Sequence, residues 1–480
     1  MKSVARRCPV AEVVRVTLRS SLVVCLALPA AVGAQLDVEP HRADADRVMA
    51  IALRDSAAWE RTALLVDRFG SRPSGSRALE QAIDWIVGEM RKDGLDNVRT
   101  EPVTVTHWVR GRESLTLLSP RREALPMKGL GRSVGTAAAG LTAPVLVVRD
   151  FAELRSRAAE AKGKIVLFNF PYDTTLHPFW AYGQAVQYRA YGVDSAASVG
   201  AVGVLVRSAG PTTSRSPHTG GLSYADTVRR VPRIPGAAVS AEDAEMMHRM
   251  QRRGERVVVN LIMGARTLPP ARSRNVIAEV RGSERPDEII VMGGHIDSWD
   301  AGQGAVDDAA GSVAAWEALR IIKSSGIRPK RTIRVVLWTN EELGLGGSLA
   351  YRDAHRAELD NHVLAMESDN GVFKPRGLLF TGSEAGLGVM RRVSSLLRPL
   401  GADSVIASGP EADVAALVAH GVPALALNTD PSRYFWYHHT DGDTIDKINP
   451  REMAECVAVM AVVALTVANL EQSLPRQAAP

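Results

Sequence analysis

Cysteine is almost absent from this chain. Only three occur in 480 residues, at Cys8, Cys25 and Cys456. The first two lie in an N-terminal segment that we expect to be removed, so the remaining chain keeps only Cys456 and can form no internal disulfide. A fold held together by disulfides is therefore excluded, and stability has to come from packing and from any bound metal.

A large excess of one charge is also missing. The 58 Lys and Arg residues are nearly balanced by 53 Asp and Glu residues, and several of the extra basic residues fall in the N-terminal segment. Nucleic-acid binding is therefore not indicated. Hydrophobic residues make up 46% of the chain and charged residues 23%. This composition is ordinary for a globular protein and argues against wholesale disorder and against a polytopic membrane protein.

The N-terminus has no hydrophobic run long enough to span a membrane. Its apolar stretch, residues 21–32, is well short of the ~20 residues that a spanning helix needs. The stretch follows several basic residues and precedes the small residues Gly33 and Ala34. This order predicts a secretory signal peptide over residues 1–34, cleaved near Ala34. We therefore expect a secreted or periplasmic protein with no stable membrane anchor after cleavage.

The rest of the chain is long enough for two or three domains. Between residues 41 and 95 the apolar residues recur at helical spacing, and Gly, Ser and Pro at positions 70–75 divide this stretch into two helices. Residues 97–106 alternate between polar and apolar side chains, which predicts a strand. We assign residues 35–114 to the first part of a main domain.

Residues 115–272 differ from the segments on either side in the length and spacing of their apolar runs. Short apolar runs at residues 143–148, 164–168 and 201–206 are separated by Gly and Pro, which predicts an inserted β-rich domain. Gly, Ser, Thr and Pro dominate residues 209–222. That composition predicts a surface loop, which could serve as a lid.

Residues 273–475 form the second part of the main domain and alternate between strand and helix patterns. This alternation predicts an α/β fold with a mixed, mostly parallel sheet between helices. Asp413 is expected to cap the last helix. The candidate strands are residues 288–292, 332–338, 362–366, 377–380 and 423–427, and the candidate helices are residues 308–324, 386–400 and 413–420.

Polar residues with metal-binding side chains follow the apolar runs. In an open α/β sheet, ligands bind at the carboxyl ends of the strands. One such residue alone has a simpler interpretation, because a lone His is more often structural and a lone Asp before a helix is more often an N-cap. Four successive runs that end in this way are a stronger signal. The residues are His295, the pair Glu341 and Glu342, Asp369, and the pair His438 and His439, with Asp307 and Asp308 at the start of a helix.

This set of side chains fits a metal site of a particular kind. Imidazole and carboxylate ligands without thiolate suit zinc, or with lower preference cobalt or manganese. Two His and three carboxylates can hold two ions if one carboxylate, best Asp307, bridges them. Two such ions could polarise a carbonyl and activate water. Glu341 then remains free to act as a general base, and Asp297 is placed to accept the other N–H of His295.

At this point the motifs resemble a known family, the di-zinc exopeptidases that include bacterial aminopeptidases and glutamate carboxypeptidases. The resemblance spans roughly residues 40–475 and extends to motifs outside the site. The stretches that carry it are Gly294-His295-Ile296-Asp297-Ser298-Trp299-Asp300, Asp307-Asp308, Glu341-Glu342, Met366-Glu367-Ser368-Asp369, His438-His439, His107-Trp108-Val109-Arg110-Gly111 and Ser216-Pro217-His218-Thr219-Gly220.

The resemblance implies two Zn²⁺ per chain, one completed by His295 and Asp369, the other by Glu342 and His439, with Asp307 as the bridge. It also implies that Glu341 is the catalytic base, that Asp297 orients an imidazole, and that the peptide bond after Asp307 is cis. The implied fold carries a protease-associated domain as the insertion, and a homodimer is implied. For His438 two interpretations stay open: a donor to the tetrahedral intermediate, or a loop histidine bonded to solvent.

The expected activity is hydrolysis of dipeptides or short peptides by an exopeptidase. A broad-specificity aminopeptidase is an alternative, because no cluster of arginines indicates a subsite for a substrate carboxylate. A glutaminyl cyclase would use one zinc, so the full ligand set argues against it. A metal-free binding protein on the same fold is a further alternative, since fold does not determine function. The aromatic run Tyr434-Phe435-Trp436-Tyr437 suggests a pocket wall or a subunit contact.

Overall fold

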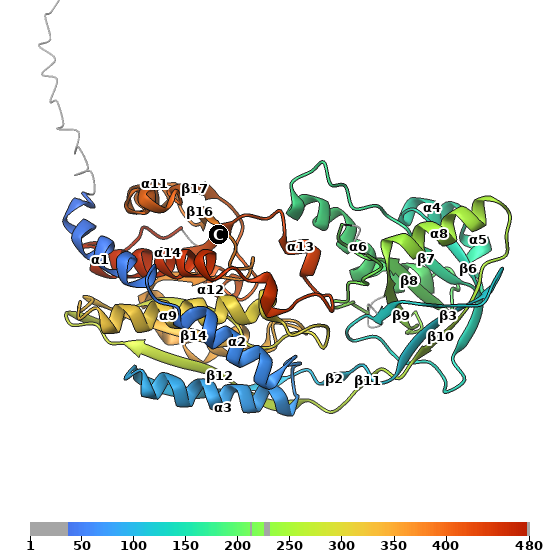
Figure 1. Cartoon of the computed structure of the whole chain (residues 1–480), viewed down its shortest axis with the longest axis horizontal. Helices are drawn as coiled ribbons and strands as arrows, with labels where there is room; N and C mark the ends of the chain where they lie inside the picture. Colours follow the sequence, from blue (N-terminus) through green and yellow to red (C-terminus); the bar gives the residue numbers. More distant parts are fainter. Residues whose placement is uncertain (1–36, 212–213, 225–230, 478–480) are drawn as a thin grey trace, which may run out of the picture. The chain divides into compact units, whose positions relative to one another are not determined.

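The computed structural model describes residues 37–211, 214–224 and 231–477. The predicted signal peptide and its cleavage site near Ala34 lie outside these residues. Figure 1 shows two sheets with their helices, joined by the short strand pair β2 and β11. The first sheet draws strands from both ends of the chain, and the second is formed by the segment between them.

The first sheet has eight strands in the order β1-β12-β14-β13-β15-β18-β16-β17. Neighbours from β14 to β18 run parallel, as do β16 and β17, whereas β1, β12 and β14 pair antiparallel and so do β18 and β16. This confirms the predicted mixed, mostly parallel sheet. In sheet order the strands are Asp96–Val105, Ala271–Val280, Arg331–Trp338, Arg285–His295, His362–Glu367, Ala424–Thr429, Pro375–Thr381 and Ser404–Ala407.

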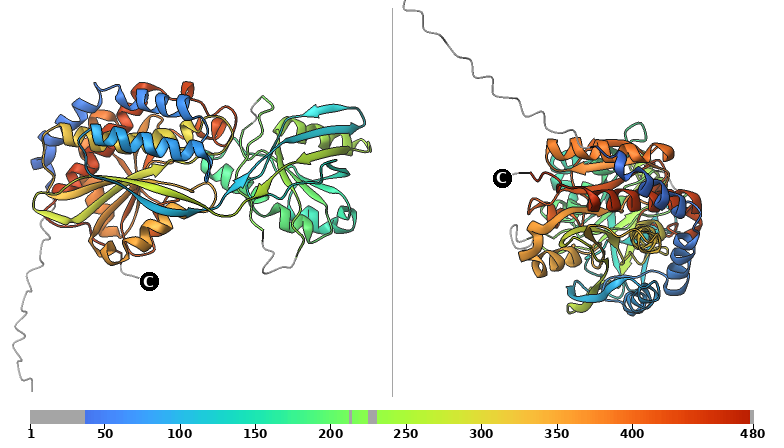
Figure 2. Two further views of the ribbon diagram at one scale, coloured as in Figure 1. Left: turned by 90° about the horizontal axis from the view of Figure 1, so that it is seen from below. Right: turned by 90° about the vertical axis from the view of Figure 1, so that its left-hand side faces the viewer.

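Helices cover both faces of this sheet (Figure 2). Helices α1, α2, α9 and α14 pack on one another, α3 packs against β1 and β12, α11 against β16 and β17, and α10 against α12. The bounds are α1 Arg42–Ala52, α2 Ala57–Phe69, α3 Arg77–Lys92, α9 Ala310–Ser324, α10 Gly346–Ala354, α11 Glu384–Ser394, α12 Ala415–Val418, α13 Tyr434–Tyr437 and α14 Pro450–Asn469, with 3-10 turns at Glu39–His41, Arg356–Asn361, Ser395–Leu400 and Ile445–Lys447.

Helix α14 is the central helix of this layer. It begins at Asn449, whose side chain accepts from the N–H groups of Arg451 and Glu452, and Pro450 occupies the first turn, a favourable start for a helix. Within the described residues it is the helix long and apolar enough to span a membrane, with a mean hydropathy of 1.6. However, 94% of the apolar stretch of this helix is buried inside the protein. Helix α14 is therefore a core helix.

The second sheet also has eight strands, in the order β4-β3-β10-β6-β7-β8-β9-β5. Strands β6 to β9 run parallel to one another, and the outer strands are antiparallel. In chain order its strands are β3 Glu113–Ser119, β4 Glu123–Leu125, β5 Met127–Gly129, β6 Leu141–Val148, β7 Ile165–Phe168, β8 Gly203–Arg207, β9 Gly236–Val239 and β10 Val258–Met263. The linking pair outside this sheet is β2 Trp108–Val109 and β11 Arg266–Thr267.

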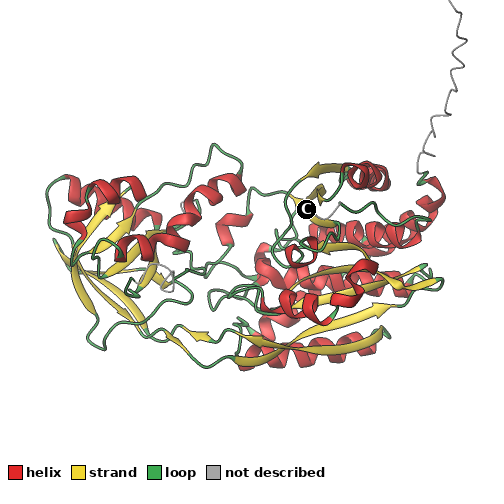
Figure 3. Ribbon diagram, turned by 180° about the vertical axis from the view of Figure 1, so that it is seen from behind, coloured by secondary structure: helices red, strands yellow, loops and turns green. Residues whose placement is uncertain are grey.

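The insertion contains more helix than the sequence pattern suggests, as the red helices among its strands in Figure 3 show. These are α4 Phe151–Ser156, α5 Ala158–Ala161, α6 Pro178–Ala197 and α8 Ala241–Arg252. The buried stripe of α6 consists largely of Ala and Gly, which a hydrophobicity pattern registers only weakly. The domain limits at residues 115 and 272, and the protease-associated class of the insertion, stay predictions.

The prediction of a surface loop at residues 209–222 is only partly right. The described residues of this segment, 209–211 and 214–222, form no helix or strand, but Pro217, His218, Thr219 and Gly220 are buried. Two of its main-chain N–H groups find partners inside the protein: Thr219 N–H donates to a carbonyl of the loop that follows α13, and Leu222 N–H donates to Gly131 O. A composition rich in Gly, Ser and Thr therefore serves close packing here.

Candidate metal centre

The predicted metal-binding residues come from five separate segments of the first sheet and its connections. His295 is the last residue of β13, and β13 and β14 end side by side because His295 pairs with Trp338. The turn after β14 carries Glu341 and Glu342, and Asp369 follows the end of β15. Because β13, β14 and β15 run parallel, their carboxyl ends deliver these side chains to one edge, as the sequence predicts.

The remaining two residues come from special backbone conformations. Asp307 lies in the segment Ala305–Ala309 that leads into α9, where the backbone of Asp307 and Asp308 is not helical, and the peptide bond between these two residues is cis, as the resemblance implies. His439 follows α13 and has a φ of 62°, in the left-handed region that non-glycine residues seldom adopt. Both residues are buried.

The five side chains meet around Asp307. One of its carboxylate oxygens, Oδ1, lies 3.1 Å from His295 Nε2, which is also 3.3 Å from Asp369 Oδ1. The other oxygen, Oδ2, lies 3.2 Å from His439 Nε2, which is also 3.2 Å from Glu342 Oε2. Each oxygen of Asp307 therefore faces its own pair of imidazole and carboxylate.

The geometry fits bound cations. Asp307 Oδ2, Glu342 Oε1 and Asp369 Oδ1 are buried and accept no hydrogen bond, although buried carboxylate oxygens nearly always have a partner. Several trios of ligand atoms lie within 4.8 Å of one another, among them those of His295, Asp307 and Glu342. A pair of divalent cations would satisfy these oxygens and offset the repulsion among the carboxylates.

Crowding of buried charges shifts the pKa of each group. Burial lowers the pKa of His439, but the carboxylates of Glu342 and Asp307 outweigh it and raise this pKa to about 9. Burial and the carboxylate of Asp307 raise the pKa of Glu342 to about 7. Burial, followed by nearby carboxylates that include Asp369, raises the pKa of Glu341 well above its ordinary value. Strongly perturbed acids gathered in one place are typical of a functional site.

Asp297 orients His295 in a way that differs from the prediction. The ring Nδ1 of His295 lies 2.9 Å from the main-chain O of Asp297, whereas the Asp297 carboxylate is 3.9 Å away. That carboxylate instead accepts from Ser74 Oγ at 2.7 Å and from Glu341 N at 3.1 Å. Asp297 thus holds His295 through its backbone and the turn of Glu341 through its side chain.

His438 and Asp308 lie inside the cluster as well. His438 is buried and stacks on His439 with ring centroids 3.5 Å apart, and its Nε2 is 3.7 Å from Asp307 Oδ2. The interpretation of His438 as a solvent-bonded loop residue is therefore wrong. Asp308 accepts from His295 N at 3.0 Å and from Gly311 N at 3.2 Å, so it fastens the end of β13 to the start of α9.

Asp413 does not cap its helix. Helix α12 is only four residues long and has Val414 at the N-cap position. The N–H of Asp413 instead donates to Glu367 Oε1 at 3.2 Å, and Val414 N–H donates to Glu367 Oε2 at 3.0 Å. Burial raises the pKa of the Asp413 carboxyl to about 7. The cap prediction failed because the helix begins two residues later than the sequence pattern suggests.

Two buried residues that the sequence reasoning missed hold the segment before Asp307. Arg72 donates to the carbonyl oxygens of Ile296, Gln303 and Gly304 at 2.8–2.9 Å. The carboxylate of Asp443 accepts from the N–H groups of Ala305, Val306 and Asp307 at 2.9, 2.6 and 3.2 Å. Their partners are backbone atoms, so the pattern of residue types contains little signal for either role.

The aromatic run around α13 divides into two parts. Tyr434 and Phe435 are buried, and Phe435 stacks on Tyr182 of α6 with centroids 4.4 Å apart. The Tyr182 ring also meets His438 edge-on at 5.2 Å. Trp436 is 45% exposed. The first part therefore packs against α6 of the insertion beside His438, and the pocket-wall and subunit-contact interpretations both stay predictions.

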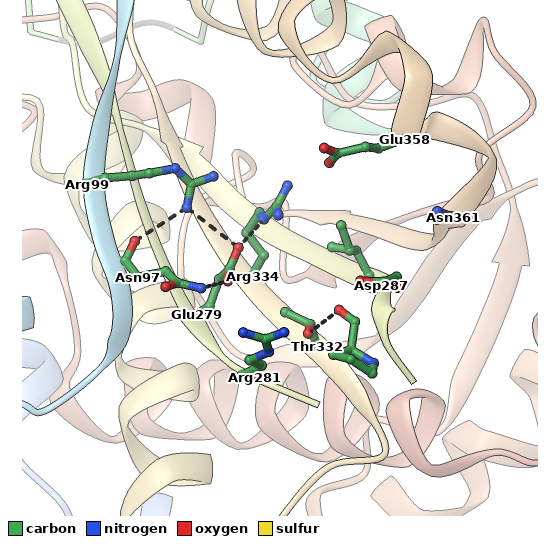
Figure 4. A pocket seen from close by; sticks show the side chains of 11 residues that line it. Asn97, Arg99, Glu279, Arg281, Asp287, Thr332, Arg334, Glu358 and Asn361 are labelled. Carbon is green, nitrogen blue, oxygen red and sulfur yellow. Dashed lines mark hydrogen bonds and ion pairs between the residues drawn. The ribbon is translucent and has the colours of Figure 1, made fainter. Parts of the chain in front are cut away.

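A surface pocket of about 390 Å³ lies at the opposite edge of the first sheet. It is lined by Arg99, Glu279 and Arg334 among others, and Figure 4 shows Glu279 between the two arginines. Thr332 and Ile289, near the starts of β14 and β13, also line it, whereas the metal-binding residues follow the ends of these strands. None of the candidate site residues lines this pocket, so it is separate from the metal centre.

Comparison with known proteins identifies the family. Residues 275–464 match the profile of peptidase family M28. Carboxypeptidase Q from Homo sapiens is 47% identical over 418 residues, which cover 87% of this chain and 86% of that protein. Carboxypeptidase Q from Xenopus laevis is 44% identical over 443 residues, 92% of each chain.

Solved structures agree with this assignment. A peptidase M28 precursor from Shewanella amazonensis has a TM-score of 0.87 at 36% identity, and the match covers 92% of this chain and 99% of that one. An aminopeptidase from Aneurinibacillus sp. strain AM-1 shares the fold, with a TM-score of 0.62 at 21% identity over 91% and 98% of the chains. The resemblance inferred from the motifs is confirmed: this chain belongs to peptidase family M28 and is similar to carboxypeptidase Q over most of its length.

Proposed function

We propose that this protein is an exported exopeptidase that hydrolyses dipeptides or short peptides at a centre of two zinc ions. The observation that carries the proposal is the division of Asp307, whose two oxygens face two different pairs of imidazole and carboxylate. One ion would be held by His295, Asp369 and Asp307. The other would be held by Glu342, His439 and Asp307.

Zinc is the ion that this set of donors suits best. Imidazole nitrogen with carboxylate oxygen and no thiolate is a common zinc environment, and Cys456, the one cysteine among the described residues, is buried in α14. The second partners of the two imidazoles are backbone carbonyls, which favour a neutral ring whose other nitrogen carries a lone pair. In His439 that lone pair faces the N–H of Trp299 at 3.2 Å as well as the carboxylates. The donor set therefore supports zinc over magnesium or calcium, which prefer oxygen ligands.

The ions would supply Lewis acidity to the scissile carbonyl and lower the pKa of water. Glu341 is the group proposed to take the proton of the attacking water and to pass it to the leaving amine. Two observations support this role: its N–H is held by the Asp297 carboxylate, and its carboxyl interacts electrostatically with His295 and Asp369. His438, beside Asp307, is positioned to donate to the developing oxyanion.

Short peptides are the proposed substrates because the insertion bounds the site. Helix α6 brings Tyr182 against His438 and Phe435. The loop of residues 217–220 contacts His439, because the N–H of Thr219 donates to the main-chain O of His439. We infer that these walls admit the end of a peptide and exclude the middle of a folded protein. Export through the N-terminal signal and a homodimer complete the proposal.

The test combines metal analysis with a substrate panel. The mature protein should contain close to two zinc equivalents and should cleave free dipeptides in a chelator-sensitive manner. Dipeptides blocked at the amino or at the carboxyl end then separate an aminopeptidase from a peptidase that needs a free carboxylate. Less than half an equivalent of zinc together with no chelator-sensitive hydrolysis would favour a metal-free binding protein.

A further inference from the structure

The inserted domain touches a metal-binding residue directly. The N–H of Thr219 donates to the main-chain O of His439 at 2.9 Å. The main-chain O of the same residue, Thr219, lies 3.3 Å from the ring Nδ1 of His439. One peptide segment of the insertion therefore binds both the backbone and the imidazole of His439.

This contact provides what a metal-binding imidazole needs. Such a ring almost always donates its second N–H to an acceptor, which fixes the tautomer and aims the other nitrogen at the metal. For His295 the acceptor is the O of Asp297, two residues away. For His439 it is the O of Thr219, 220 residues away in sequence. Arg189 Nη1 also lies 3.3 Å from this Nδ1, but a guanidinium can only donate and cannot accept that proton.

The backbone contact has a second consequence. His439 adopts a left-handed φ of 62°, which costs a non-glycine residue free energy and persists only where the surroundings enforce it. The hydrogen bond from Thr219 N–H to the carbonyl of His439 contributes to that enforcement. Without it, the peptide could relax and carry the imidazole away from Glu342 and Asp307.

Thr219 is itself held rigidly. Its side chain is fully buried, and its Oγ1 donates to Gly129 O at 2.8 Å and accepts from Arg110 Nη2 at 3.3 Å. Arg189 donates to its main-chain O at 3.2 Å. The next residue, Gly220, has a φ of 128°, and a Cβ there would lie 2.3 Å from Arg189 Nη1. A side chain at this position would displace the Arg189 guanidinium, and a φ of 128° is strained for any residue other than glycine.

We propose that the inserted domain is a working part of the metal centre, with Thr219 as a positioning residue for His439. The inference rests on the proposed two-zinc function and deepens it. The segment around Thr219 sets the affinity of the ion held by Glu342 and His439 and leaves the ion held by His295 and Asp369 almost unaffected.

The first test is Gly220→Ala, with Gly163→Ala as its matched control. Both glycines belong to the insertion and have positive φ, but nothing lies within 4 Å of a Cβ at Gly163. Zinc titration against a competing chelator should show one ion bound as in the wild type and the other about 10–100-fold more weakly in Gly220→Ala. Gly163→Ala should bind both ions like the wild type.

A second pair of variants avoids backbone strain. Thr219→Val removes the hydroxyl that anchors the segment to Gly129 and Arg110, and Thr219→Ser keeps it. Thr219→Val should weaken the same ion, and Thr219→Ser should restore wild-type affinity. Cobalt-substituted protein gives an independent readout, because the visible spectrum of only one of the two ions should change.

The outcomes separate this inference from the proposed function. A wild-type protein that binds fewer than two ions would overturn the two-zinc proposal and the inference with it. A wild type with two ions, and variants that bind both unchanged, would overturn the inference alone. Equal weakening of both ions would also overturn it, because that result indicates general destabilisation. Thermal unfolding of the variants in chelator shows that each is folded before titration.

Discussion

At the scale of single residues, the centre depends on carboxylates with different tasks. Asp307 divides its oxygens between two groups of ligands, and Glu341 stands beside them with its N–H held by Asp297. Asp443, which the sequence did not predict, accepts three N–H groups from the turn that carries Asp307. Removing each carboxylate should therefore damage a different property.

Glu341→Gln should keep the metal and lose the reaction. The amide has nearly the same shape but cannot accept the proton of water, and general-base catalysis typically contributes about 10²–10⁴-fold. We expect kcat for dipeptides to fall by that order while zinc content stays at the wild-type value. Glu60→Gln, on an exposed position of α2, is the control and should change neither. Near-normal turnover in Glu341→Gln would remove the assigned role.

Asp443→Asn should weaken the protein and its metal binding together. The amide places an N–H₂ group where the carboxylate accepts N–H groups of residues 305–307, so at least one donor loses its partner at a cost of about 1–3 kcal/mol. Urea unfolding should show this loss, and zinc affinity should fall. Asp441→Asn is the matched control, since Asp441 is 62% exposed and pairs only with Lys128. Equal effects of the two substitutions would contradict the assignment.

At the scale of elements, α10 is tied to the sheet by a buried polar network. Tyr351 of α10 accepts from Arg334 of β14 at 2.9 Å and contacts Nε2 of His362, the first residue of β15, at 2.9 Å. The other ring nitrogen of His362 lies 2.9 Å from Glu358 O. Burial, supported by the charge of Arg334, lowers the pKa of His362 from 6.5 to about 4. The network thus requires a neutral imidazole.

This pKa predicts how stability depends on pH. The unfolded chain binds the proton near pH 6.5 and the folded protein only near pH 4, so this contribution is complete above pH 6.5 and is lost as the pH falls toward 4. At pH 5 the loss amounts to about 2 kcal/mol. Urea unfolding in chelator should show His362→Asn losing about 2 kcal/mol less than the wild type between pH 8 and pH 5. His248→Asn, on the surface of α8, should behave like the wild type.

At the scale of the whole molecule, the metal centre joins segments from nearly the full length of the chain. Thr219 forms a hydrogen bond with His439 there, and Arg72 forms one with Gly304. Because the ligand set exists only in the folded protein, bound zinc should stabilise the folded state selectively. The insertion and the first sheet would then share one source of stability.

Chelation should therefore lower the thermal unfolding temperature. At a free zinc concentration 100 times the Kd, each site adds about 2.7 kcal/mol. We expect a chelator to reduce Tm, zinc to restore it, and magnesium at equal concentration to fail, because the imidazole ligands do not suit magnesium. In Asp307→Asn, the zinc-dependent shift should be much smaller. A Tm that is indifferent to chelator would argue against the metal centre as a structural link.

Much of the fold follows from local sequence patterns. The strands that end at His295, Trp338 and Glu367 were predicted from apolar runs, and α2, α3 and α9 from helical periodicity. Both patterns can be recognised because the buried face of a strand or helix carries apolar residues at the period of that element. The five side chains around Asp307 were also visible, since imidazoles and carboxylates are conspicuous after apolar strands. The long helix α6 was missed because its buried stripe is Ala and Gly.

The sequence by itself determined which imidazole and carboxylate side chains gather at the edge of the first sheet and which family the chain resembles. The tertiary structure decided what holds those side chains in place. The acceptors of the two imidazoles are main-chain oxygens of Asp297 and Thr219, and every residue type carries such an oxygen. Backbone atoms leave no signature in the order of residues, so only the folded chain could show that the insertion reaches His439.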